Sequence, residues 1–172
     1  ATRLQRGPLA PKGLQTRAVG ARVASRAVPP PVTAKLCHAG HQDMRLSLRG
    51  NQLHELPSTL SLLLNLESLD LNSMHGLKEL PKKLFELRSL LSLNLSDCNI
   101  GDKGLCSLAD AIKENGTLFE LNLSHNKFAR TGLTHLAKCL ATNTGLITLD
   151  LLGHRINSEV ASAFVDMFAG NM

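Results

Sequence analysis

Residues 118–128 read LFELNLSHNKF, and this stretch decides the fold. Taken alone, its Ser124 and His125 suggest a nucleophile beside a base. The pattern LxxLxLxxNxL recurs, however, and its other copies begin at Leu46, Leu66, Leu90 and Leu146. Self-similarity along a chain has to be interpreted before any local motif. Ser124 and His125 are therefore interpreted as repeat positions, and no catalytic residue is predicted.

The copies are in phase with one another. Aligned on the middle leucine, their spacings are 23, 24, 28 and 28 residues, and the aligned positions are Leu46, Leu69, Leu93, Leu121 and Leu149. In a short strand, alternate residues point to opposite faces. The leucines therefore predict the core side of one parallel sheet, and the residues between them predict its other side.

From about residue 44 to residue 172 the chain resembles the leucine-rich repeat family. The first copies contain ELPSTLSLLLNL and ELPKKLFELRSL and resemble the short subclass, whereas the last three resemble ribonuclease-inhibitor-like repeats. The resemblance implies an α/β solenoid, with a short parallel sheet on the concave side and helices on the convex side. It also implies protein binding as the usual work of the fold, so neither enzymatic activity nor a cofactor is expected.

Helix-period patterns follow the later strands. Their apolar faces are Leu105, Leu108, Ala109 and Ile112, then Leu133, Leu136, Ala137 and Leu140. A last segment has Ser158 as candidate N-cap and a similar apolar face made of Val160, Phe164, Met167 and Phe168. Phe164, Met167 and Phe168 are expected to cover the C-terminal end of the stack. After Pro57 and Pro81 there is room for only one or two helical turns.

The asparagine of the pattern is a turn position, where a side-chain amide satisfies backbone groups. Asn51 and Asn126 fill it in two copies. Met74, Cys98 and His154 fill it in the others, which predicts an interrupted ladder of amides and less regular turns there.

Residues 1–43 are predicted to be an extended basic arm, and residues 44–172 the repeat domain. Residues 1–42 carry seven basic residues and no acid, while the remaining 130 carry twelve basic and fourteen acidic residues. A composition rich in Ala, Gly, Pro and Arg does not fold alone. We expect residues 32–37 to lie over the first repeat and residues 1–28 to bind a neighbouring molecule through Arg3, Arg6, Arg17, Arg22 and Arg26.

A second candidate partner surface is the concave face. Its predicted binding residues are Arg45, Arg49, Asp70, Asn72, Asn94, Glu120, Asn122 and Asp150. This face lacks the Lys/Arg stripe and aromatic side chains of a nucleic-acid groove. It favours a short, polar protein-binding face, with a merely solvated sheet surface as the alternative.

Three functions stay open at this stage. The first is a non-enzymatic scaffold subunit that the arm holds in a larger multiprotein assembly; the second is a subunit bound to the rRNA of an organelle ribosome; the third is a small inhibitor or regulator.

An arginine-rich, acid-free segment is typical of mitochondrial targeting, so a mitochondrial location is favoured over the cytoplasm. The four cysteines show no paired framework, which favours a reducing compartment. Cys37, His38 and His41 resemble a ligand cluster but match no zinc pattern, so no metal site is predicted.

Overall fold

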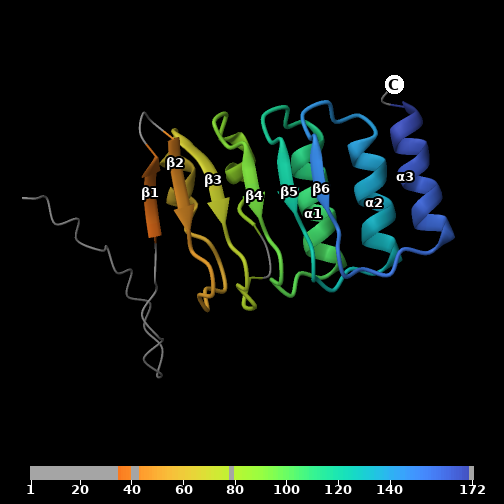
Figure 1. Cartoon of the computed structure of the whole chain (residues 1–172), viewed down its shortest axis with the longest axis horizontal. Coiled ribbons are helices and arrows are strands. Elements are labelled where there is room, and N and C mark those ends of the chain that lie inside the picture. The colour runs from red at the N-terminus through yellow and green to blue at the C-terminus, as the bar shows by residue number, and fades with distance from the viewer. Residues whose placement is uncertain (1–34, 40–42, 78–79, 171–172) are drawn as a thin grey trace, which may run out of the picture.

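The computed structural model describes residues 35–39, 43–77 and 80–170, which form one curved layer of strands backed by one layer of helices (Figure 1). The sheet order is β1-β2-β3-β4-β5-β6, which follows the chain. The strands are β1 (Lys35–Ala39), β2 (Asp43–Ser47), β3 (Leu66–Asp70), β4 (Ser92–Asn94), β5 (Glu120–Asn122) and β6 (Thr148–Asp150). The 3₁₀-helices are η1 (Ser58–Leu62) and η2 (Lys82–Glu86), and the α-helices are α1 (Asp102–Lys113), α2 (Arg130–Leu140) and α3 (Ser158–Gly170).

The predicted register of the repeats is confirmed. Strands β2 to β6 pair in parallel, and the paired middle leucines are Leu46, Leu69, Leu93, Leu121 and Leu149. The strand leucines of the inner units are fully buried, and the predicted faces of α1 and α2 are buried. The segments after Pro57 and Pro81 form only the five-residue helices η1 and η2, as their length predicted.

Strand β1 departs from the repeat pattern. It pairs antiparallel with β2, with Leu36 opposite Leu46, and so adds a strand to the first edge of the sheet. It lies within the segment predicted to be an extended arm; of residues 32–37, expected over the first repeat, Lys35–Cys37 are described and occupy that place. The predicted contacts of residues 1–28 lie outside the described residues.

Two expectations for α3 are wrong in detail. The side chain of Asn157, not of Ser158, caps the helix, because its Oδ1 accepts the Val160 N–H at 3.0 Å. Met167 is buried against the stack and Phe164 half-buried, but Phe168 is 65% exposed. Helix α3 therefore covers only part of the C-terminal end. Among the helices of the described residues, none is long and apolar enough to cross a bilayer.

Candidate functional site

The concave face carries the predicted binding residues in rows across the sheet. The strand register places Ser47, Asp70, Asn94, Asn122 and Asp150 side by side. Arg45, Arg49 and Glu120 are exposed, and their side chains make no hydrogen bond to another described residue. The basic part of the face is thus confined to the first unit.

Four members of this row bond to their own turn. An Oδ1 atom accepts the backbone N–H two residues further on, at 2.9–3.0 Å, in each of Asp70, Asn94, Asn122 and Asp150. This is the Asx-turn geometry that Asp and Asn favour. The side chains predicted as partner contacts therefore first hold the bend that ends each strand.

Neighbouring hydroxyls and amides complete this row. Ser47 Oγ donates to Asp70 Oδ2 at 3.2 Å, and the Ser96 and Ser124 hydroxyls donate to Asn94 and Asn122 at 2.7 Å. Asn72 Nδ2 lies 2.5 Å from Ser96 Oγ. The middle of the concave face is a polar surface whose groups already have partners.

The asparagine ladder is less interrupted than predicted. Asn126 accepts the N–H groups of Cys98 and Ile100 and donates to the carbonyls of Leu95 and Leu123. In the preceding copy the Cys98 thiol donates to Leu71 O at 3.0 Å, and in the last copy His154 Nδ1 lies 2.8 Å from Leu151 O. A thiol or an imidazole thus replaces one bond of the missing amide, and only Met74 offers no donor.

The Ser124–His125 pair is not brought together as a catalytic site. Ser124 is buried with its hydroxyl on Asn122, while His125 has φ 56°. Positive φ recurs at this turn position in all five copies, at Gly50, Ser73, Asp97, His125 and Gly153. His125 is therefore a turn residue of the repeat.

The C-terminal end of the stack holds an apolar groove of about 540 Å³ between β6 and α3. Leu149 and Leu151 form its floor and Phe164 and Phe168 its helix side. At and beside it, exposed apolar side chains are Ile147 (79%), Leu152 (66%), Ile156 and Val165. The equivalent leucines of the preceding copy, Leu121 and Leu123, are fully buried because β6 and its leucines cover them.

The backbone of this end is open as well. In the first four copies an N–H at one equivalent position donates to the next copy at 2.8–2.9 Å, through Leu48, Leu71, Leu95 and Leu123. A second set of backbone N–H groups donates to carbonyls of the next copy at 2.8–3.0 Å, from Gly50, Ser73, Asp97 and His125. The corresponding donors of the last copy, Leu151 N and Gly153 N, have no acceptor among the described residues.

Comparison with known proteins agrees with this repeat geometry. The family model described as "Leucine Rich repeat" matches residues 86–109, which span the end of η2, β4 and most of α1. This chain contains leucine-rich repeats. A solved structure titled "Leiomodin-1 Actin-Binding Site 2 (ABS2)" superposes with a TM-score of 0.52 at 19% identity, over 73% of this chain and 79% of that chain. A structural match at this level of sequence identity shows a shared fold alone. No curated protein sequence matches the chain.

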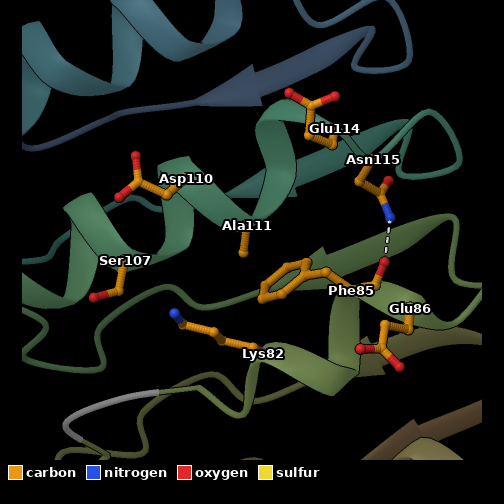
Figure 2. Close-up of a pocket in the computed structure, with 8 residues that line it drawn as sticks. All are labelled: Lys82, Phe85, Glu86, Ser107, Asp110, Ala111, Glu114 and Asn115. Atoms are coloured by element: carbon orange, nitrogen blue, oxygen red, sulfur yellow. Dashed lines mark hydrogen bonds between the residues drawn. The ribbon is translucent and has the colours of Figure 1, made fainter.

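The convex side of the leucine-rich repeats carries a further groove, of about 340 Å³, between η2 and α1. Figure 2 shows the Phe85 ring beneath Ala111 and the Asp110 carboxylate directed away from that ring. Asn115 Nδ2 donates to Phe85 O at 2.8 Å, and Asn143 in the next copy donates to Ile112 O at 2.7 Å. These amides form a second asparagine ladder, where each helix returns to the next strand.

Sequence reasoning missed three features of this leucine-rich repeat domain. The second ladder had a signal in ENGTL and TNTGL, which are 28 residues apart. The second feature is the apolar groove between β6 and α3, which has no motif of its own in the sequence. The third is a contact of Asp110 with His135 and Cys139 on the convex side; its signal was the spacing of His135 and Cys139, which are one turn apart on an expected helix.

Proposed function

We propose that this protein is a non-enzymatic binding module that captures an extended segment of a partner protein at the β6 edge. The observation that carries the proposal is the coincidence of an open strand edge with an apolar groove at one end of the solenoid. Strand addition at an exposed sheet edge is a general mode of peptide recognition: main-chain bonds give affinity and side-chain pockets give specificity.

The chemistry of the partner segment follows from the ladder. Leu151 N and Gly153 N require two carbonyl acceptors. In the preceding copies Leu91 O and Phe119 O each accept two amides from the next copy, so Ile147 O is the matching acceptor for the partner's N–H groups. The partner strand should run parallel to β6 and place leucine-like side chains on Leu149 and Leu151. Such a segment repeats the contacts that every inner copy makes with its neighbour.

The concave face supports a preference in charge. Glu120 is exposed on β5, the strand that pairs with β6, and the half-buried Asp150 lies on β6 itself. Basic residues in the partner that flank the added strand would face these carboxylates. Such rim charges mainly affect the association rate and its dependence on salt.

The direct probe is a peptide with the sequence of residues 118–128. Within the chain this segment contains β5 and pairs with β4, so the peptide could pair with β6 in the same way. We expect its labelled form to bind the full chain, as read by fluorescence anisotropy, and Phe168→Lys to weaken binding about tenfold or more because it puts a charge at the groove. Leu64→Lys is the matched control, since Leu64 is a similarly exposed apolar side chain (73%) away from the groove.

Equal affinity of the two variants, or no binding by the full chain, would overturn strand capture at β6. The alternative occupant of the groove is a second copy of the chain, and sedimentation velocity over a range of protein concentrations tests it. A concentration-dependent dimer that Phe168→Lys abolishes would place that second copy in the groove.

We further propose that the basic arm holds the protein in a larger assembly, with a mitochondrial location as the favoured setting. The acid-free composition of residues 1–42 supports this role, with Arg3, Arg6, Arg17, Arg22 and Arg26 as the contacts. Deleting residues 1–28 should abolish incorporation while leaving the repeats folded. Binding to RNA would instead be recognised by a steep loss of affinity with salt in a titration against ribosomal RNA.

A further inference from the structure

The convex side brings together three side chains that can bind a metal ion. Asp110 projects from α1, and His135 and Cys139 project from the same face of α2, one turn apart. One ligand atom from each lies within 4.8 Å of the other two. We propose that Asp110, His135 and Cys139 form a binding site for a transition-metal ion with the preferences of Zn²⁺. This inference does not depend on strand capture at β6.

The distances suit tetrahedral coordination. With metal–sulfur bonds of about 2.3 Å and metal–nitrogen or metal–oxygen bonds of about 2.1 Å, sulfur lies about 3.6 Å from the other ligands of a tetrahedron. Cys139 Sγ lies 3.6 Å from His135 Nε2 and 3.7 Å from Asp110 Oδ1. Only the edge between His135 Nε2 and Asp110 Oδ1 is shorter, at 2.8 Å, because a proton now joins these atoms. Exchanging that proton for a metal ion requires the pair to separate by about 0.6 Å.

The donor set selects the class of metal. Thiolate and imidazole are ligands of zinc and other late transition metals, whereas Mg²⁺ and Ca²⁺ prefer an all-oxygen set. Binding requires two bonds to hydrogen to break. The Cys139 thiol proton is released to water, and the His135 Nε2 proton leaves as the imidazole takes up its Nδ1–H form, so that sulfur and Nε2 each bond to the metal. The three protein ligands leave the fourth position to water, as in open zinc sites.

The surroundings allow entry and retention of an ion. The Asp110 side chain is exposed, His135 is half-buried and Cys139 is buried, so the site opens to solvent on the carboxylate side. Helices α1 and α2 belong to consecutive copies and pack directly on each other, so a bound ion would link two repeats. Cys106, one turn before Asp110 on α1, is the nearest further thiol on that helix.

Cobalt is the probe, because a thiolate bound to Co²⁺ gives a charge-transfer absorption that aqueous Co²⁺ lacks. The full chain, first stripped with a chelator, should take up one equivalent of Co²⁺ with this band, and Zn²⁺ should displace it and raise the Tm. We expect Cys139→Ser and Asp110→Asn each to weaken metal binding by more than about 100-fold. Substituting residues that only hydrogen-bond to metal ligands already lowers metal affinity about 10- to 100-fold.

Two features keep the test decisive. Asp110 is exposed, so Asp110→Asn leaves the fold intact even if Cys139→Ser does not, and far-UV circular dichroism checks both. The matched control is His75→Asn, because His75 lies 3.9 Å from Asp97 in a His–Asp pair that forms no group of three metal-binding atoms among the described residues. No uptake at micromolar Co²⁺, or a band that survives Cys139→Ser and vanishes in Cys106→Ser, would overturn the site.

Discussion

The two edges of the described sheet differ in how far they are covered. At the first edge, β1 pairs antiparallel with β2 and so covers a row of backbone groups with a strand that does not belong to the repeat. At the last edge, α3 buries Val160 and Met167 but leaves the β6 backbone and an apolar groove open among the described residues. A stack of like units has no natural end, and an open edge is a template for pairing. Among the described residues, the first edge is thus paired with a strand, whereas the last edge keeps unpaired backbone groups beside an apolar groove.

The largest expected loss of stability comes from a charge placed in the middle of the stack, and the same change in the last copy serves as the comparison. Leu121→Asp puts an unpaired charge into a fully buried site and should lower the free energy of unfolding by on the order of 4 kcal/mol. Leu149→Asp, one copy later in the same register, should cost less than half as much because Leu149 borders the groove. Urea unfolding followed by circular dichroism measures both. Glu120→Lys, on the exposed face of β5, should change stability by less than about 0.5 kcal/mol.

Equal midpoints for Leu121→Asp and Glu120→Lys would mean that the faces of the strand are reversed. Equal losses for Leu121→Asp and Leu149→Asp would mean that the last copy is as closed as the middle one.

The next effect concerns the ladder position of the same two copies. Asn126→His removes the acceptor of the Cys98 and Ile100 amides and should cost about 2–3 kcal/mol, since buried donors are left unpaired. The reverse change at the end, His154→Asn, keeps a donor for Leu151 O and loses only the stacking on Phe128, whose ring centroid lies 4.7 Å away. It also removes the buried His154 Nε2, which has no hydrogen-bond partner within the described part of the chain. Thermal unfolding of the two variants should therefore differ clearly, and similar Tm losses would contradict the assignment of Asn126 as the link between copies.

A smaller effect tests the closed end. Deleting residues 1–39 removes β1, exposes the edge of β2 and should lower stability by about 1–2 kcal/mol, with concentration-dependent association through the new edge. Deleting residues 1–28 is the control and should leave stability unchanged. Sedimentation and urea unfolding separate the two; a stable, monomeric 40–172 fragment would show that β1 does not protect the domain.

The smallest effect lies on the convex side between the ends. The hydrogen bond from His135 lowers the pKa of Asp110 below its ordinary range. A carboxyl whose pKa is lower in the folded than in the unfolded state contributes stability above its unfolded pKa, and this contribution is lost as the pH falls through the folded pKa. In metal-free buffer, Asp110→Asn should thus have a slightly lower Tm than the native chain at pH 6, and the difference should shrink as the pH falls below the ordinary Asp value of about 4. Asp166→Asn, an exposed carboxyl on α3, is the control.

The fold could be predicted almost completely from the repeats. The spacing of the middle leucines sets the register of β2 to β6, and helix periodicity gives the buried faces of α1 and α2, because both patterns describe burial directly. Strand β1 could not be predicted in this way, since KLCHA matches no other segment of the chain and its pairing depends on the free edge of β2. The cap of α3 was misassigned by one residue because Asn157 and Ser158 are both good caps.

The candidate sites were harder to predict than the fold. The sequence placed Asp70, Asn94, Asn122 and Asp150 on the concave face, but the use of their oxygens within the turn depends on backbone geometry that spacing does not contain. The Asp110, His135 and Cys139 contact joins two helices whose relative rotation is set by packing. The open groove arises where α3 packs incompletely against the last strand, and such a gap has no motif of its own.

The Asx turns of the concave face have a consequence for how such a surface can evolve. Asp and Asn are nearly identical in shape, and either supplies the Oδ1 acceptor that the four turns require. Exchanging one for the other changes the charge of the face by one unit and leaves the turn bond in place. The present set holds two acids and two amides, so single-base substitutions could shift these four positions from neutral to fourfold acidic without redesigning the scaffold. The charge of these four positions and the turns that they hold can therefore change independently of each other.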